Sequence, residues 1–247
     1  MAWLRTENQP VSGFAPRQAR DGLAGAGLDA GVRSFLQRVY LFMSLGLAAT
    51  GVVAMAVASS PAALEFVFGN RIVFYGLIIA QLGLVMAFSA VAARVSVGTA
   101  GLMFFGYAAL TGVTLSAIFI RYTAGSLAGT FFITAGSFAA LSFYGLVTKR
   151  RLDSLGSFCF MGLVGLIIAS IVNIFLNSPV LYWLTTFVGV IVFTGLTAYD
   201  TAKIKLLAQE AGPGDGRSKL AMQGALTLYL DFINLFLMLL RIFGRRR

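Results

Sequence analysis

The stretch that decides the fold is AMQGALTLYLDFINLFLMLLRIF, residues 221–243. It is apolar over enough length to cross a bilayer as a helix, which takes about 20 residues. One acid interrupts it, Asp231, which lies almost at the midpoint of the run. A carboxylate at that depth costs several kcal/mol unless it is paired, hydrated or protonated. The stretch therefore predicts a transmembrane helix that carries a polar site inside the membrane.

Apolar runs of similar length precede this one, over residues 39–59, 72–93, 98–120, 126–147, 155–176 and 180–200. The connectors between them are too short to hold a soluble domain. We therefore predict an all-α fold, a polytopic membrane bundle of seven transmembrane helices. Residues 1–37 are polar, glycine-rich and basic, and they predict a flexible cytoplasmic tail ahead of a transmembrane domain over residues 38–247.

The composition excludes most other classes of protein. Hydrophobic residues make up 58% of the 247 and charged residues 11%, against about 45–50% and about 25% in a soluble domain. The net charge of +10 then indicates basic loops at a membrane rather than a nucleic-acid partner. The chain has no histidine, one cysteine (Cys159) and no nucleophile-elbow, Walker, EF-hand or zinc motif, so we expect neither an enzyme nor a resident cofactor.

The basic residues indicate how the chain is oriented, because cytoplasmic loops are enriched in lysine and arginine. With the N-terminus inside, the outer loops hold only Arg71 and Arg121, and the inner loops hold Arg94, Lys149, Arg150, Arg151, Lys203, Lys205, Arg217 and Lys219. We therefore expect a multi-pass protein with a cytoplasmic N-terminus. Seven crossings would place Arg241 and residues 245–247 outside, against the rule. Either the last segment crosses nevertheless, or it enters without crossing fully.

A second acid, Asp200, lies at the end of the sixth apolar run. Gly212, Pro213 and Gly214 are the helix breakers that follow, so we expect this helix to continue to around Gln209. At 1.5 Å per residue, Asp200 then lies about 14 Å and Asp231 about 17 Å from the turn between the last two helices. The two carboxyl groups are therefore expected at a similar depth on antiparallel neighbours.

Two facing carboxyl groups have a predictable chemistry. They cannot both ionise cheaply in a low dielectric, so the pair titrates as a unit. Sharing a proton, Asp200 and Asp231 would hold their helices together; doubly ionised, they would attract a hard cation such as Ca²⁺. Because the chain has no histidine, this pair is the candidate pH sensor and the candidate Ca²⁺ site. Alternatively, Asp200 pairs with Lys203 at i+3, or Asp231 is a permanently protonated packing residue.

Other polar residues near these runs are supporting candidates. Arg94, at the inner end of the second run, is either a basic partner for the pair or only a determinant of topology. Asn234 extends the polar stripe around Asp231, together with Thr227. Asn173, inside the fifth run, is expected to bond between helices. Small residues at four-residue spacing predict close helix packing, at Ala108, Gly112 and Ser116 and again at Gly165 and Ala169.

Both aspartates lie in motifs that resemble a known family. Ala198-Tyr199-Asp200-Thr201-Ala202-Lys203-Ile204 and Leu228-Tyr229-Leu230-Asp231-Phe232-Ile233-Asn234-Leu235-Phe236, followed by Leu240-Arg241, are similar to the paired C-terminal motifs of the Bax inhibitor-1 family, in particular its bacterial members. Tyr122-Thr123-Ala124-Gly125-Ser126, Thr130-Phe131-Phe132-Ile133-Thr134 and Asn173-Ile174-Phe175 add to the resemblance, which covers roughly residues 35–245.

The resemblance implies seven helices with the last one central and surrounded by the other six. It also implies a pH-sensitive calcium leak gated by the aspartates at positions 200 and 231. The family latch uses an acid in the second segment and an arginine near its inner end. In this chain the acid position corresponds to Gln81 and the arginine lies near Arg94, so the chain departs from the family at the acid.

These observations lead to one expected function and two alternatives. The first is a pH-sensitive calcium (cation) leak channel of the bacterial inner membrane, in which Ca²⁺ and protons are the ligands of the aspartate pair. The alternative, from a different class, is a non-conducting regulatory protein that modulates a membrane protease or another membrane complex. A proton-coupled transporter is the third, although no broken-helix substrate site is evident in the sequence.

Overall fold

The computed structural model describes residues 17–92, 94–210 and 215–247, and these residues form helices and short connections. The helices are α1 (Arg17–Ala58), α2 (Pro61–Leu64), α3 (Arg71–Val91), α4 (Val97–Arg121), α5 (Ala124–Val147), α6 (Asp153–Leu176), α7 (Pro179–Glu210) and α8 (Asp215–Phe243), with a π-helical turn η1 (Glu65–Gly69) before α3. Seven of these helices are long and apolar enough to cross a bilayer. The all-α bundle with seven candidate spans is thereby confirmed.

Capping side chains explain where several helices begin. Ser96 accepts a hydrogen bond from the Thr99 N–H at the start of α4, and Thr123 caps α5 in the same way. Asn177 ends α6 with a left-handed backbone (φ 49°), a conformation that asparagine tolerates better than most residues. Pro179 then opens α7, where its missing N–H costs nothing.

The helix α7 continues well past the end of its apolar run, as the sequence predicts. It ends at Glu210, so Asp200 lies within the helix rather than at its end. The breakers at positions 212–214 lie outside the described residues. The chain then returns through α8, which begins at Asp215 and runs alongside α7.

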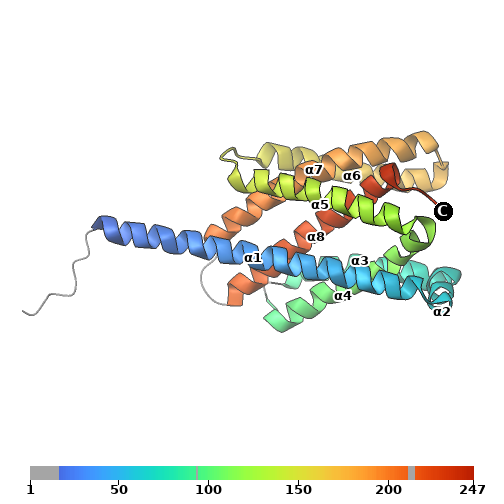
Figure 1. Ribbon diagram of the computed structural model, residues 1–247, viewed down its shortest axis with the longest axis horizontal. Coiled ribbons are helices and arrows are strands. Elements are labelled where there is room, and N and C mark those ends of the chain that lie inside the picture. Colours follow the sequence, from blue (N-terminus) through green and yellow to red (C-terminus); the bar gives the residue numbers. More distant parts are fainter. Residues whose placement is uncertain (1–16, 93, 211–214) are drawn as a thin grey trace, which may run out of the picture.

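The last helix, α8, is the centre of the bundle (Figure 1). It packs directly against α1, α4, α5 and α7, while α3 packs on α4 and α6 packs on α7 at the two flanks. Half of the residues in its membrane-spanning window are buried, against 6% in α3. Helices in the middle of a bundle are apolar all round, which is why a polar residue on α8 has to find a protein partner.

The expected tail is helical where it is described. Residues 17–37 belong to α1, and the part of α1 that can span a membrane begins at Ala30. Phe35 is 1% exposed, and the guanidinium of Arg217 lies 5.7 Å from its ring centroid. The turn of α1 around Phe35 therefore packs against the start of α8, while the division into a flexible tail and a transmembrane domain stays a prediction. Residues 1–16 lie outside the described residues, and the cytoplasmic location stays a prediction.

The chain ends at the opposite end of the bundle from the α7–α8 connection. Residues 244–247 lie along the link between α4 and α5 (Figure 1), where the Thr123 N–H donates to the Arg245 carbonyl at 3.2 Å. The Arg247 N–H donates to the Arg121 carbonyl at 3.0 Å. α8 therefore runs the full length of the bundle and is long enough to cross a bilayer, while the side on which the C-terminus lies stays a prediction.

One of the two small-residue stripes is a packing face and the other is not. Ala108 and Ser116 are fully buried, and a Cβ on Gly112 would come within 2.7 Å of the Thr50 carbonyl oxygen. The prediction is confirmed there, since α1 and α4 approach closely. It is wrong at Gly165, where a Cβ would meet nothing within 4 Å. That face of α6 points away from the bundle, so spacing alone does not identify a helix interface.

Candidate functional site

The structure brings Asp200 and Asp231 together. Asp200 lies on α7 and Asp231 on α8, and the two carboxyl groups are within hydrogen-bonding reach of each other. Asp231 is 5% exposed, while Asp200 is partly exposed. Counting residues from a shared turn places both acids at one depth, and the helices are rotated so that they meet. Their roles stay a prediction.

The contact has a consequence for protons. The Asp231 Oδ2 atom is buried and has no hydrogen-bond donor among the described residues. An ionised carboxylate only accepts hydrogen bonds, so two ionised groups in contact could not form a hydrogen bond with each other. One proton on either group turns the contact into a hydrogen bond. The arrangement is therefore suited to hold one proton between α7 and α8.

The basic residues expected as partners form no ion pair with the aspartates, although Lys203 is near enough to Asp200 for the two charges to interact. The Lys203 ammonium lies 5.9 Å from the centroid of the Tyr199 ring, is exposed, and makes no ion pair with Asp200. Arg94 is exposed just beyond the end of α3 and makes no ion pair with either aspartate. Neither the i+3 pairing of Asp200 with Lys203 nor a latch through Arg94 is formed in this structure.

Glycines hold α7 tightly on both sides of Asp200. On one side, a Cβ on Gly145 of α5 would come within 2.5 Å of the Ala198 carbonyl oxygen. On the other side, a Cβ on Gly156 of α6 would come within 2.5 Å of the Tyr199 ring. The α5 and α7 backbones therefore approach as closely as only glycine permits, and at Gly156 the glycine leaves room for the Tyr199 ring. Neither residue can be recognised from the sequence, because a single glycine in an apolar helix is not distinctive.

Hydrogen bonds from α7 to α5 continue this attachment. The Thr201 hydroxyl donates to the Ser142 hydroxyl at 3.4 Å, and both side chains are buried. One helical turn further along, the Lys205 ammonium donates to the Leu146 carbonyl near the end of α5. Asp200 is therefore carried by a firmly anchored segment.

The remaining candidate side chains do not reach the pair. Asn234 donates to the Leu230 carbonyl of its own helix at 2.8 Å. Asn173 accepts a hydrogen bond from the Ser178 N–H at 2.9 Å, so it stabilises the α6–α7 connection rather than bonding between helices within the membrane. Gln81 donates to the hydroxyls of Thr111 and Thr114 on α4, both at 3.2 Å. Gln81, which stands where the family has an acid, therefore forms uncharged hydrogen bonds between α3 and α4.

A second polar contact on α8 was missed by the sequence analysis. Tyr229 is 0% exposed, and its hydroxyl lies 2.7 Å from the Thr50 hydroxyl on α1. Thr50 also contacts the carbonyls of Gly46 at 3.0 Å and Ala108 at 2.8 Å. Carbonyl oxygens only accept, so the single hydroxyl hydrogen of Thr50 is donated to these carbonyls. In the contact with Tyr229, the Tyr229 hydroxyl therefore donates and the Thr50 hydroxyl accepts. We call this contact between Tyr229 and Thr50 the tyrosine clamp.

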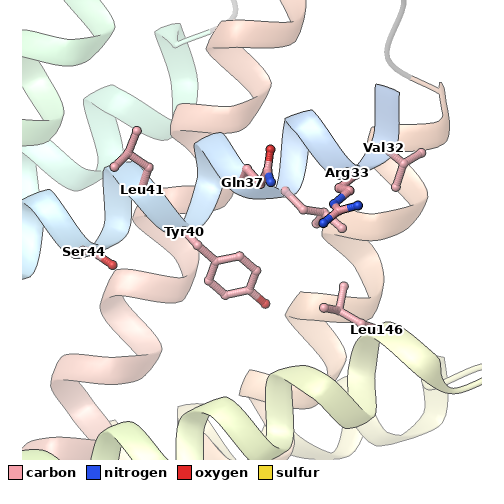
Figure 2. Close-up of a pocket in the computed structure, with 8 residues that line it drawn as sticks. Val32, Arg33, Gln37, Tyr40, Leu41, Ser44 and Leu146 are labelled. Carbon is pink, nitrogen blue, oxygen red and sulfur yellow. The ribbon is translucent and has the colours of Figure 1, made fainter. Parts of the chain in front are cut away.

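A groove separates α1 from α5 at the end of the bundle where α7 and α8 are connected. Its volume is about 630 Å³, and the residues that line it include Arg33, Gln37, Tyr40 and Leu146. Figure 2 shows Tyr40 pointing from α1 across the groove, with Leu146 on the opposite wall. The Tyr40 hydroxyl is shielded from solvent and has no hydrogen-bond partner among the described residues. Leu146 follows Gly145, so this wall lies close to the segment that carries Asp200.

The described residues contain no cluster of three or more acids, cysteines or histidines that would hold a metal permanently. Two carboxyl groups offer at most four oxygens, whereas Ca²⁺ takes six to eight oxygen ligands. Backbone carbonyls or water would have to supply the rest.

Comparison with known proteins agrees with this architecture. The model of a family described as "Inhibitor of apoptosis-promoting Bax1" matches residues 32–247. The inner membrane protein YbhL of Escherichia coli (strain K12) is 52% identical over 220 residues, which cover 88% of this chain and 94% of YbhL. An uncharacterized protein of Rickettsia prowazekii is 45% identical over 221 residues, covering 89% of this chain and 92% of its own length.

Proposed function

The chain belongs to the Bax inhibitor-1 family and is a multi-pass inner membrane protein, and from that premise we propose that it is a pH-sensitive leak channel for Ca²⁺. The observation that carries the proposal is the contact between Asp200 and Asp231 across α7 and α8. In the proposal, the state with one shared proton is closed, and the state with none is open to the cation.

The energetics favour opening when the shared proton leaves. Two unit charges about 4 Å apart repel by about 4 kcal/mol at the effective dielectric of a partly buried site. A hydrogen bond between membrane helices contributes about 0.6 kcal/mol on average and about 1.7 kcal/mol at most. The repulsion between Asp200 and Asp231 is therefore larger than the contribution of the one hydrogen bond that they share when protonated. Flux should rise as the pH rises, because a higher pH removes the proton.

The groove between α1 and α5 supplies a route toward the pair from the end that we propose is cytoplasmic. Its volume of about 630 Å³ is room for several water molecules at about 30 Å³ each, and the Tyr40 side chain extends into it from α1 (Figure 2). Arg33 and Gln37 lie at its entrance. Further along α1, a second pocket between α1, α4, α5 and α8 forms the apolar half of this route, and the side chains that line it include Phe131, Phe232 and Phe236. In the proposed closed state this apolar half is the barrier.

The test is Ca²⁺ uptake into proteoliposomes between about pH 6 and pH 8, the range in which a carboxyl pair in a low dielectric exchanges its proton. The wild-type protein should show a flux that increases with pH. Asp200→Asn together with Asp231→Asn keeps the shape of the site and removes both titrating groups, so the pH dependence should disappear. Asp153→Asn is the matched control, because Asp153 is an exposed acid at the start of α6.

The proposal fails if the double asparagine variant keeps both the flux and its pH dependence. It also fails if the folded wild-type protein conducts no Ca²⁺ at any pH. The second result would favour the alternative, a non-conducting protein that modulates a membrane protease or another membrane complex. Under that alternative, deletion of residues 1–30 should abolish the cellular phenotype; under the channel proposal the same deletion should leave flux unchanged.

A further inference from the structure

Arginines from three separate parts of the chain converge at the end of the bundle where the chain terminates. Arg121 ends α4, Arg241 lies in the last turn of α8, and Arg246 belongs to the C-terminal segment. All three line the same two adjoining pockets, whose volumes are about 320 Å³ and about 590 Å³. Tyr182, near the start of α7, is common to both pockets. We call this site the arginine pocket.

The fold positions these arginines rather than leaving them on a loose tail. Arg246 pairs with Tyr122 as an isolated antiparallel bridge, flanked by the hydrogen bonds of Thr123 and Arg247. Gly244 permits this docking, because a Cβ there would lie 2.6 Å from Cδ1 of Tyr122. The Arg241 guanidinium lies 5.1 Å from the centroid of the Tyr182 ring, a distance at which the ring face attracts the cation.

No acidic side chain lines either pocket. Of the described residues, no acid lies within 4.0 Å of the nitrogens of Arg121, Arg241 or Arg246 to form an ion pair. Arg121 and Arg241 each lie in the last turn of a helix, whose partial negative charge favours a cation. Three guanidinium groups that line one site with no acid beside them still repel one another, and an arginine cannot relieve this by losing its proton. The first turn of α7, at Pro179, and the amide side chain of Asn177 also line the larger pocket, and a helix N-terminus favours a negative charge. The pocket is therefore built for an anion.

The surroundings identify the source of the anion as a lipid. The pocket lies where α4 and α8 end and α7 begins, so it lies at the level where a bilayer meets water. Trp183 lines it, is 43% exposed, and stacks on Phe187 with ring centroids 5.8 Å apart. Exposed aromatic residues at helix ends are typical of the membrane–water interface. Phe243 and Ile174 next to the pocket are exposed apolar residues against which acyl chains can lie.

We propose that the arginine pocket binds the phosphate of an anionic phospholipid in the leaflet at this end of the bundle. Guanidinium groups match the geometry of phosphate oxygens through paired hydrogen bonds. With a cytoplasmic N-terminus this is the outer leaflet. A bound lipid phosphate then neutralises the C-terminal arginines that lie outside against the positive-inside rule.

The experiment measures which lipids stay on the purified protein. Native mass spectrometry of the full chain, supplied with equal amounts of phosphatidylglycerol and phosphatidylcholine, should show preferential retention of phosphatidylglycerol. Arg121→Gln with Arg241→Gln should lower its affinity by about tenfold or more, because each substitution removes charge-assisted hydrogen bonds to the phosphate. Arg71→Gln with Arg150→Gln is the matched control, because both residues are exposed and neither lines the pocket.

Two further measurements keep the proposal falsifiable. Arg246→Gln changes an exposed residue of the docked segment, so the protein should fold and should still retain less phosphatidylglycerol. Excess inorganic phosphate should not displace the lipid, because it lacks the acyl chains that lie on the apolar flank. Equal retention of the two lipids, equal reductions in the pocket and control variants, or displacement by inorganic phosphate would each overturn the proposal. None of these readouts depends on Ca²⁺ flux.

Discussion

The tyrosine clamp is the contact whose removal tests most directly how α8 is held. Tyr229→Phe deletes one oxygen and keeps the ring, which packs edge-on against Phe104 and Tyr107 with centroids 5.9 Å and 6.0 Å apart. Thr50→Val deletes the other hydroxyl without changing the shape of its side chain. Neither change opens a cavity, so the measured effect reports the hydrogen bond and not the packing.

The size of the effect follows from the environment. The Tyr229 hydroxyl is fully buried and bonds to Thr50 at 2.7 Å. A side-chain hydrogen bond between membrane helices contributes about 0.6 kcal/mol on average and up to about 1.7 kcal/mol, because the unfolded chain in the membrane also finds partners. Thr50→Val should cost more than Tyr229→Phe, since it also removes the hydrogen bond to the Ala108 carbonyl.

The assay is a double-mutant cycle on reversible unfolding of the protein in lipid nanodiscs or mixed micelles. The coupling free energy between Tyr229→Phe and Thr50→Val should be about 0.6–1.7 kcal/mol. Tyr75→Phe is the matched control, because Tyr75 is 61% exposed and its hydroxyl makes no hydrogen bond among the described residues. It should change the unfolding free energy by less than about 0.5 kcal/mol. A coupling energy indistinguishable from zero would refute the clamp.

Other predictions concern glycines at which the structure fixes the direction of the effect. Gly145→Ala should destabilise the protein by about 1–3 kcal/mol, because its Cβ would overlap the backbone of Ala198. Gly165→Ala should instead be neutral or stabilise by up to about 1 kcal/mol, since its Cβ meets open space; equal unfolding free energies for the two variants would contradict this packing. Gly244→Ala should detach the C-terminal segment, and hydrogen exchange would then show faster exchange at the Thr123 and Arg247 amides. Unchanged exchange there would mean that the docking needs no glycine.

The sequence predicts the architecture well because the bilayer restricts it strongly. A helix must be apolar for about 20 residues to cross, so runs of that length identify the spans directly. The depth of Asp200 and Asp231 follows from counting residues back to a turn, since the rise per residue is constant. The extension of α7 to Glu210 follows in the same way from the breakers beyond it.

What the sequence could not predict is which face of each helix meets which neighbour. Gly145 and Gly165 look alike in an apolar run, yet one lies against a backbone and the other against nothing. All faces of a membrane helix are apolar, so the periodicity that separates core from surface in a soluble protein is weak here. The start of α1 is a second example. Its polar, glycine-rich sequence is typical of a tail, although Phe35 is buried against α8 in the bundle.

The two polar contacts of α8 face different neighbours, and this has consequences for the proposed gate. Residues 229 and 231 are two apart, so their side chains leave the helix in directions about 160° apart, on nearly opposite faces. Asp231 meets α7, while Tyr229 meets α1 beside α4. In the proposed gate only the aspartate contact loses a proton, because a tyrosine hydroxyl keeps its proton near neutral pH. Losing that proton would release one face of α8 and leave the other attached. α8 would therefore tilt about the tyrosine clamp and stay within the bundle. On this reasoning, Tyr229→Phe raises the leak at every pH, whereas the paired asparagine substitutions remove its dependence on pH.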